Sequence, residues 1–309
     1  MEGDRVRVLL VGGESAAVQC LNRLQLRDDT EVVAVVPADQ PGNPLPKAAL
    51  PAGIPVWPIS SITGPDAGAT IRSHRVDILL NVHSLHLLGE PAVTAPRMGA
   101  FNLHPGPLPE YAGLNPVSWA IFNSENGHGV TVHAMTDRTD AGPIAFERRF
   151  PISSSDTALT LSANCVTAGV ELLDELIATV ASGQPVPARE QDLSQRRYFQ
   201  AGAPDDARIN WRWHSDRIAR LVRACAYAPF PSPGGQAWTM SDGARVEVLA
   251  VRLLGAAGGT PVKVLAYDGD SAVIAAGTGA VTVDRIRVGD ERSSPRAAFR
   301  LGARVDQSE

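Results

Sequence analysis

The chain has 309 residues, of which 44% are hydrophobic and 20% are charged. This composition is typical of folded globular proteins and excludes a disordered or fibrous chain. The length predicts two domains, since a domain commonly has roughly 100–200 residues. The formal net charge is −5, so the chain lacks the overall excess of basic residues by which many proteins bind nucleic acids.

The sequence shows no sign of a membrane anchor or an export signal. No apolar run approaches the ~20 residues that a membrane-spanning helix needs, and the run at residues 6–11 is too short and too early for a signal peptide. Cys20, Cys165 and Cys225 show no metal-ligand spacing, and their odd number argues against a disulfide framework. We therefore predict a cytoplasmic protein with no membrane partner and no metal, whose cysteines are buried.

The first half of the chain alternates predicted strands and helices. A buried strand over residues 5–11 runs into Gly12 and Gly13, whose spacing lacks the dinucleotide-binding pattern and indicates a tight turn. The other predicted elements are helices over 14–26 and 62–74 and strands at 30–36, near Val56, at 76–82 and at 99–104. Strands that alternate with helices indicate a parallel sheet with helices on both faces.

The second half contains a predicted hairpin, a long helix and a second domain. Residues 129–135 and 145–150 are predicted to pair as strands, and a helix over 157–182 is predicted to be capped by Ser155 or Asp156. The polar, proline-containing segment 191–204 is interpreted as a linker between a domain at 1–190 and a domain at 205–309. For the latter we predict a helix at 215–226 and short strands at 236–240, 245–254, 261–267, 272–276 and 280–288, which is typical of a small β-barrel.

One stretch of the chain concentrates chemically useful side chains. In an extended strand Asn102 and His104 project from the same face, because side chains alternate with a period of two. The prolines and glycines of residues 105–113 force a rigid, non-helical loop beside that pair. Further along, the turn at 139–142 presents the carboxylate of Asp140, a natural partner for His104. Taken singly, each of the three residues also has a structural explanation as a turn or strand-end residue.

Together with their flanking residues, these three side chains resemble the folate-dependent formyltransferase family. The similar motifs are Asn102-x-His104, the Leu108-Pro109 loop with Tyr111-Ala-Gly113, Gly129-Val-Thr131 and Asp140-Ala-Gly142. Segments 209–211, 220–224 and 229–231 resemble the opening of the family's C-terminal domain. The chain has Gly106 and Ala112 where many members have serine and arginine, so the loop beside the acceptor departs from the family pattern.

The resemblance implies an α/β fold, in which a Rossmann-like, mostly parallel sheet forms the formyltransferase domain and a small OB-like β-barrel follows it. It implies that 10-formyltetrahydrofolate is the co-substrate and that Asn102, His104 and Asp140 are catalytic. Asn102 would donate a hydrogen bond to the oxyanion, a protonated His104 could add a second donor, and Asp140 would orient the imidazole. Whether His104 takes the proton directly or through a water held by Asp140 stays open.

The resemblance also indicates which residues bind the two substrates. The pterin is expected against backbone groups of Ser84, Leu85, His86, Leu87 and Leu88, with Thr139 and Asp140 closing over it. The acceptor is expected near Pro105, Gly106, Tyr111, Asn115 and His133. Two of these have a structural alternative: Asn115 as the N-cap of a helix at 117–122, and His133 as a satisfied structural histidine.

The acceptor distinguishes the functional hypotheses. The first is N-formyl transfer to a small-molecule amine, either an amino sugar or an ornithine-type or hydroxyornithine-type amine of siderophore or peptide biosynthesis. The second, methionyl-tRNA formyltransferase, needs clustered basic residues for the phosphates, whereas basic and acidic residues nearly balance after Asp205, so tRNA is not the expected partner. The others are formyltetrahydrofolate hydrolysis and a non-enzymatic binding module that has kept the fold. A homodimer is expected by analogy with sugar-modifying relatives.

Overall fold

The computed structural model describes residues 5–39, 41–254 and 260–305 of the chain, which packs as two compact units. The first unit holds residues 1–113, 128–150 and 163–198, and the second holds 114–127, 151–162 and 199–309. The predicted domain boundaries at 190 and 205 stay predictions. Within the described ranges, every helix is too short or too polar to span a bilayer.

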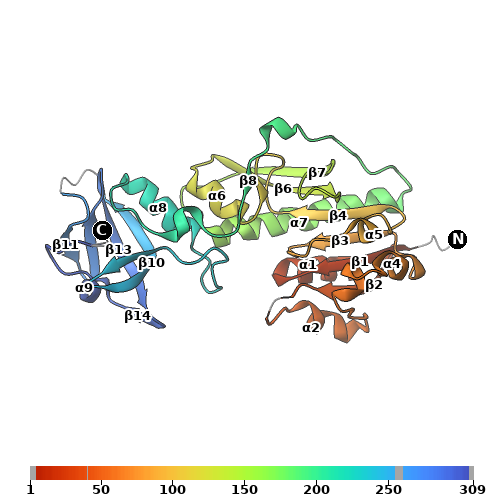
Figure 1. Cartoon of the computed structure of the whole chain (residues 1–309), viewed down its shortest axis with the longest axis horizontal. Coiled ribbons are helices and arrows are strands. Elements are labelled where there is room, and N and C mark those ends of the chain that lie inside the picture. The colour runs from red at the N-terminus through yellow and green to blue at the C-terminus, as the bar shows by residue number, and fades with distance from the viewer. Residues whose placement is uncertain (1–4, 40, 255–259, 306–309) are drawn as a thin grey trace. The chain divides into compact units, whose positions relative to one another are not determined.

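A six-stranded sheet forms the centre of the first unit, in the order β2-β1-β3-β4-β6-β7. Its strands are β1 (Val6–Gly12), β2 (Thr30–Pro37), β3 (Ile78–Val82), β4 (Gly99–His104), β6 (Gly127–Ala134) and β7 (Ile144–Pro151). β1 pairs in parallel with β2 and β3, and β3 pairs in parallel with β4 (Figure 1), whereas β6 is antiparallel to β4. The prediction of a mostly parallel α/β sheet is confirmed.

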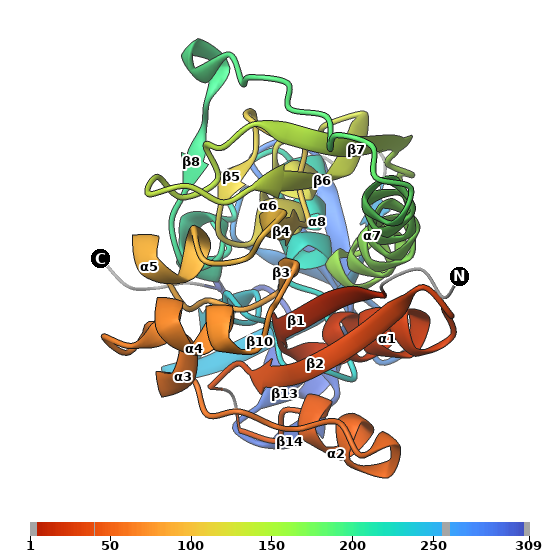
Figure 2. The ribbon, with the colours of Figure 1, turned by 90° about the vertical axis from the view of Figure 1, so that its right-hand side faces the viewer.

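Helices cover both faces of this sheet (Figure 2). One face packs against α1 (Glu14–Gln25), α2 (Leu45–Ala49) and α7 (Ala158–Ala181), and the other against α3 (Ser60–Thr63), α4 (Ala67–Ser73) and α5 (Glu90–Val93). Alternate residues of β1 divide between the two cores: Val8 and Leu10 lie in the first, Leu9 and Val11 in the second. The part of a strand that is buried on both faces is usually apolar, which explains the continuous apolar run from Val8 to Val11.

An antiparallel sheet forms the centre of the second unit, in the order β11-β12-β13-β10-β9, with β14 paired to β13. Its strands are β9 (Trp238–Ser241), β10 (Ala244–Leu254), β11 (Val264–Asp268), β12 (Ser271–Ala275), β13 (Ala280–Val288) and β14 (Glu291–Ser293). The helices of this unit are α6 (Pro116–Phe122), α8 (Ser215–Ala224) and α9 (Pro295–Ala298). The prediction of a second domain built from short antiparallel strands is confirmed.

Two predicted elements differ from the structure. The predicted helix at 62–74 is two helices, α3 and α4, because Gly64 is extended and Pro65 has no N–H to continue the helical hydrogen bonds. The strand predicted near Val56 is a single bridge to Val35 and does not extend into a strand.

Two helix caps also differ. The N-cap of α7 is Thr157, whose Oγ1 accepts a hydrogen bond from the backbone N–H of Thr160 (3.3 Å), so neither Ser155 nor Asp156 caps the first turn as predicted. Asn115 lies at the N-cap position of α6 (Pro116–Phe122), as the capping alternative predicts, but its side chain does not make the capping hydrogen bond. Asn115 is left-handed (φ 53°) and makes no side-chain cap; its Nδ2 donates to the carbonyl oxygen of Gly202 (3.0 Å) within the second unit.

Candidate functional site

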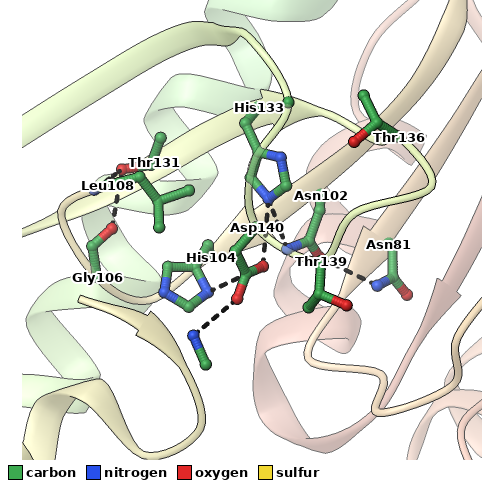
Figure 3. A network of polar contacts seen from close by, with 12 residues as sticks. Asn81, Asn102, His104, Gly106, Leu108, Thr131, His133, Thr136, Thr139 and Asp140 are labelled. Atoms are coloured by element: carbon green, nitrogen blue, oxygen red, sulfur yellow. Dashed lines mark hydrogen bonds and ion pairs between the residues drawn. The ribbon is translucent and has the colours of Figure 1, made fainter. Parts of the chain in front are cut away.

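Neighbouring strands of the first unit bring four polar side chains together. Asn81 on β3 is paired with Asn102 on β4, and Asn102 is paired with His133 on β6. His104 follows two residues after Asn102 and projects from the same face of β4. Figure 3 shows these side chains around Asp140, which comes from the turn between β6 and β7. The structure therefore brings the three predicted catalytic residues to one place and adds Asn81 and His133 to them.

Asp140 is a buried carboxylate held in an uncommon backbone conformation (φ 52°). Its Oδ2 accepts a hydrogen bond from the backbone N–H of Gly113 (2.8 Å), and its Oδ1 lies 3.7 Å from Nδ1 of His104 and 3.5 Å from Nε2 of His133. Burial alone would raise the pKa of Asp140. The attraction of His104, the nearby ring of His133 and the hydrogen bond from Gly113 outweigh burial, so the pKa of Asp140 lies well below the ordinary value and the group is ionised.

His104 is held by a backbone carbonyl group. Its Nε2 lies 2.7 Å from the carbonyl oxygen of Tyr111, which can only accept, so Nε2 carries the proton of the neutral imidazole. Nδ1 is then bare and faces Asp140. Burial lowers the pKa of His104, and the opposing attraction of Asp140 does not cancel that effect. This direction favours an imidazole that is a base at neutral pH; the protonated donor expected from the sequence stays a prediction.

The proline-containing loop after His104 is fastened by side chains of β6. Thr131 Oγ1 donates to the carbonyl oxygen of Gly106 (2.8 Å) and accepts from the N–H of Leu108 (3.3 Å), and Nε2 of His128 bonds the carbonyl oxygen of Pro105 (2.9 Å). The carbonyl groups of Pro105 and Gly106 thus hold the loop against β6 by accepting these hydrogen bonds. Acceptor binding by these two residues stays a prediction.

The turn that carries Asp140 lies close against β6 at Gly142. A Cβ atom built on Gly142 would run into the carbonyl oxygen of Ala134, which belongs to β6. Only glycine allows the turn to come this close. The glycine of the Asp140-Ala-Gly142 motif is therefore required by packing.

Residues 189–197, here called the strap, hold the Asp140 turn from the other side. Arg189 exchanges two backbone hydrogen bonds with Ile144 (2.9 and 2.8 Å). The buried Gln191 donates from Nε2 to the carbonyl oxygens of Asp140 (3.2 Å) and Gly142 (2.7 Å). The sequence assigned Gln191 to a surface linker, and no local pattern distinguishes it from the polar residues around it.

The strap also holds the loop that orients His104. The carbonyl oxygen of Arg197 accepts a hydrogen bond from the N–H of Ala112 (3.0 Å), and its guanidinium lies 4.7 Å from the centre of the Tyr111 ring. Tyr111 is buried, and its carbonyl group is the partner of His104. The structure thus gives Tyr111 a role in orienting the imidazole, whereas acceptor binding by Tyr111 stays a prediction.

The predicted pterin segment is an open loop that follows β3. Leu85 and Leu87 are 70% and 78% exposed, and no backbone–backbone hydrogen bond joins residues 84–88 to another described residue. The N–H of His86 donates to Oγ of Ser84 (3.3 Å). Exposed apolar side chains beside N–H and C=O groups without backbone partners fit a flat ring with polar edges, such as a pterin. His86 accepts a hydrogen bond at Nε2 from the N–H of Asp39 (3.1 Å), and Leu88 lies in the core beneath the loop. Folate binding by this loop and by the exposed Thr139 stays a prediction.

Two of the residues at the site were not singled out from the sequence. Asn81 carried a signal: it is a polar residue inside an otherwise apolar strand, on a face that the sheet buries. Thr131 lies in a quoted motif, but its two hydrogen bonds depend on a loop that is distant in the sequence. In the described part of the chain no three His, Cys, Asp or Glu side chains are grouped as metal ligands would be.

Comparisons with known proteins show the family of the chain. Residues 4–177 match the family model described as formyl transferase, and residues 203–303 match the model described as formyl transferase, C-terminal domain. The methionyl-tRNA formyltransferase of Roseiflexus sp. (strain RS-1) is 29% identical to this chain over 314 residues, which cover 98% of this chain and 94% of that protein.

Solved structures share the fold at lower identity. WlaRD, a sugar 3N-formyl transferase determined with dTDP and 5-N-formyl-THF, has a TM-score of 0.69 at 20% identity, covering 94% of this chain and 100% of that chain. The N-formyltransferase from Helicobacter canadensis, in complex with folinic acid and dTDP-3-aminofucose, has a TM-score of 0.67 at 19% identity, covering 90% and 98%. A variant of HypX from Aquifex aeolicus reaches 0.68 at 18% identity; 95% of this chain is covered, but only 48% of the HypX chain.

We predict that Gln191→Leu destabilises the first unit, because two buried carbonyl groups lose their hydrogen-bond donor. The free energy of unfolding, measured by urea denaturation, should fall by about 1–3 kcal/mol. Gln195→Leu is the matched control: Gln195 is exposed on the same strap, and its replacement should change stability by less than about 0.5 kcal/mol. Equal stability of the two variants would show that Gln191 does not hold the turn.

Proposed function

Because the chain belongs to the formyl transferase family, we propose that it transfers the formyl group of 10-formyltetrahydrofolate to the amine of a small-molecule acceptor. One observation carries the proposal: a neutral imidazole with a bare Nδ1, an ionised carboxylate and a carboxamide meet at one buried place. Acyl transfer to an amine needs a base, a group that stabilises the protonated base and a donor for the developing negative charge.

Asn102 is proposed as that donor. When bound, 10-formyltetrahydrofolate supplies an activated formyl carbon, which the lone pair of the acceptor amine attacks. An N–H of Asn102 stabilises the negative charge that develops on the formyl oxygen, and such a donor commonly contributes about 3–4 kcal/mol to the transition state. One N–H of the Asn102 carboxamide lies toward Nε2 of His133 (3.1 Å), which leaves the second for the substrate.

His104 and Asp140 are proposed to move the proton. Nδ1 of His104 accepts the proton that the attacking amine must lose and returns it to the leaving nitrogen of the folate. The imidazolium that forms in between is stabilised by the carboxylate of Asp140, which lies 3.7 Å from Nδ1. This separation is longer than a direct hydrogen bond, so the attraction between the imidazolium and the carboxylate is electrostatic.

A small amine is proposed as the acceptor, and the charge pattern of the second unit supports it. Several arginines of this unit form ion pairs with acidic side chains, namely Arg220 with Asp216, Arg252 with Asp268 and Asp284, Arg287 with Glu247, and Arg300 with Asp242. Positive charge used in these pairs is less available to RNA phosphates. Two solved proteins that share the fold are named as N-formyltransferases of sugars or were determined with a nucleotide-linked amino sugar.

Methionyl-tRNA is the second candidate acceptor. The observation that favours it is the 29% identity to the Roseiflexus methionyl-tRNA formyltransferase over nearly the whole length of both chains. The catalytic steps proposed above would be the same, because the acceptor group is again an amine. Only the surface that binds the rest of the acceptor would differ.

The acceptor can be identified directly. The protein is incubated with 10-formyltetrahydrofolate and each of a set of amines: nucleotide-linked amino sugars, ornithine, hydroxyornithine and methionyl-tRNA. We expect tetrahydrofolate release together with the mass of one added formyl group on a small amine, and a loss of about 10²–10⁴-fold in His104→Ala. Formylation of the tRNA alone would replace the proposed acceptor. Folate release without a formylated amine would indicate hydrolysis, and no release with any amine would refute the proposal.

The acid limb of the pH–rate profile tests the base. Because burial lowers the pKa of His104, kcat/KM should rise with pH through a midpoint below the ordinary histidine value of about 6.5. The attraction of Asp140 opposes this lowering, so Asp140→Asn should move the midpoint to still lower pH while reducing the rate. A midpoint above the ordinary value, or a shift to higher pH in Asp140→Asn, would contradict a base of this kind.

A further inference from the structure

Asn81, Asn102 and His133 form a row of hydrogen bonds beside the proposed reaction site. At the His133 end, a backbone carbonyl group determines which ring nitrogen is the donor. Nδ1 of His133 lies 2.9 Å from the carbonyl oxygen of Ala134, which can only accept. Nδ1 therefore carries a proton, and in the neutral imidazole Nε2 is an acceptor. Nε2 in turn lies 3.1 Å from the side-chain nitrogen of Asn102.

The next step fixes the carboxamide of Asn102. The NH2 group of Asn102 faces Nε2 of His133, and Oδ1 of Asn102 faces the opposite way. That oxygen lies 3.0 Å from Nδ2 of Asn81, which donates to it. The row therefore runs in one direction, from Asn81 through Asn102 to His133 and the carbonyl group of Ala134. Figure 3 shows Asn81, Asn102 and His133 side by side.

Asn81 is unusual in this position. It lies on β3, is 5% exposed, and is paired in register with Asn102. Its own Oδ1 has no hydrogen-bond partner among the described residues, and a buried polar atom without a partner costs free energy. An aliphatic residue would pack here without that cost, as Ile78, Leu79 and Leu80 do on the same strand. The carboxamide of Asn81 is therefore better explained by what it does to Asn102 than by stability.

We propose that Asn81 is a positioning residue, which turns the carboxamide of Asn102 so that its N–H rather than its carbonyl oxygen faces the reacting formyl group. This inference rests on the proposed function, in which Asn102 donates to the developing oxyanion. Asn81 itself does not contact the reacting atoms. If Asn102 were reversed, its carbonyl oxygen would face the negative charge and repel it.

The test is Asn81→Asp, which keeps the shape of the side chain but replaces its NH2 group by an acceptor. The nitrogen of Asn102 then turns toward the new carboxylate, and its oxygen turns toward the reaction and His133. We expect kcat to fall by about 10²–10³-fold, the effect of losing one oxyanion donor, with KM for both substrates little changed. Asn81→Leu removes the constraint without reversing it, so kcat should fall by only about fivefold, equivalent to one neutral hydrogen bond.

Asn43→Asp is the matched control. Asn43 also lies in the first unit and donates from Nδ2 to the carbonyl oxygens of Gly12 (3.1 Å) and Ala38 (2.9 Å), with no contact to Asn102. This variant should lose stability but keep kcat near the wild-type value. A kcat for Asn81→Asp equal to that of Asn43→Asp would overturn the inference. If Asn81→Asp does not fold, a wild-type kcat in Asn81→Leu would overturn it.

A second readout separates this inference from the proposed function. 15N NMR of the His133 ring reports whether Nε2 is bare or protonated, and it needs no turnover. We expect a bare Nε2 in the wild type near neutral pH and a protonated Nε2 in Asn81→Asp, because the reversed Asn102 then offers an oxygen. If the protonation of the His133 ring is the same in Asn81→Asp as in the wild type, the role of Asn81 is refuted even if the enzyme is active. An inactive wild type that shows the change would refute only the proposed function.

Discussion

A single hydrogen bond, from Nε2 of His104 to the carbonyl oxygen of Tyr111, sets the protonation pattern of the site. Because a carbonyl oxygen can only accept, the proton of the neutral imidazole stays on Nε2 and Nδ1 becomes the base. Burial keeps His104 neutral, and its neighbours keep Asp140 ionised. The base and the carboxylate that stabilises its charged form are thus in place before any substrate binds, which is what an efficient site requires.

That hydrogen bond depends on segments that are distant in the sequence. Tyr111 lies in the loop after β4, and Asp140 lies in the turn after β6. The two are linked directly, because the N–H of Gly113 donates to Asp140. The strap of residues 189–197 bonds both, through Gln191 on the turn and Arg197 on the loop. A segment that looks like a connector between domains therefore belongs to the support of the proposed catalytic residues.

Much of the fold and the core of the site could be predicted from the sequence. The apolar run of β1 and the two-residue spacing of Asn102 and His104 are local patterns, and the match of several motifs to one family supplied Asp140. Gln191 and Thr131 could not be found this way, because each acts on a carbonyl group of a distant turn or loop. The protonation state of His104 depends on burial by residues far along the chain, so it could not be inferred from the local sequence. The cap of α7 was misassigned because Thr157 and its neighbours are all plausible caps.

The most direct test of this account is the tautomer of His104, measured by 15N NMR of the ring in the wild-type protein near neutral pH. The account predicts a neutral ring with a proton on Nε2 and a bare Nδ1, since Nε2 donates to Tyr111 and burial disfavours the charged form. A ring protonated on both nitrogens, or a neutral ring with its proton on Nδ1, would contradict it. Either result would mean that His104 cannot take a proton at Nδ1, and the proposed route of the proton would have to be abandoned.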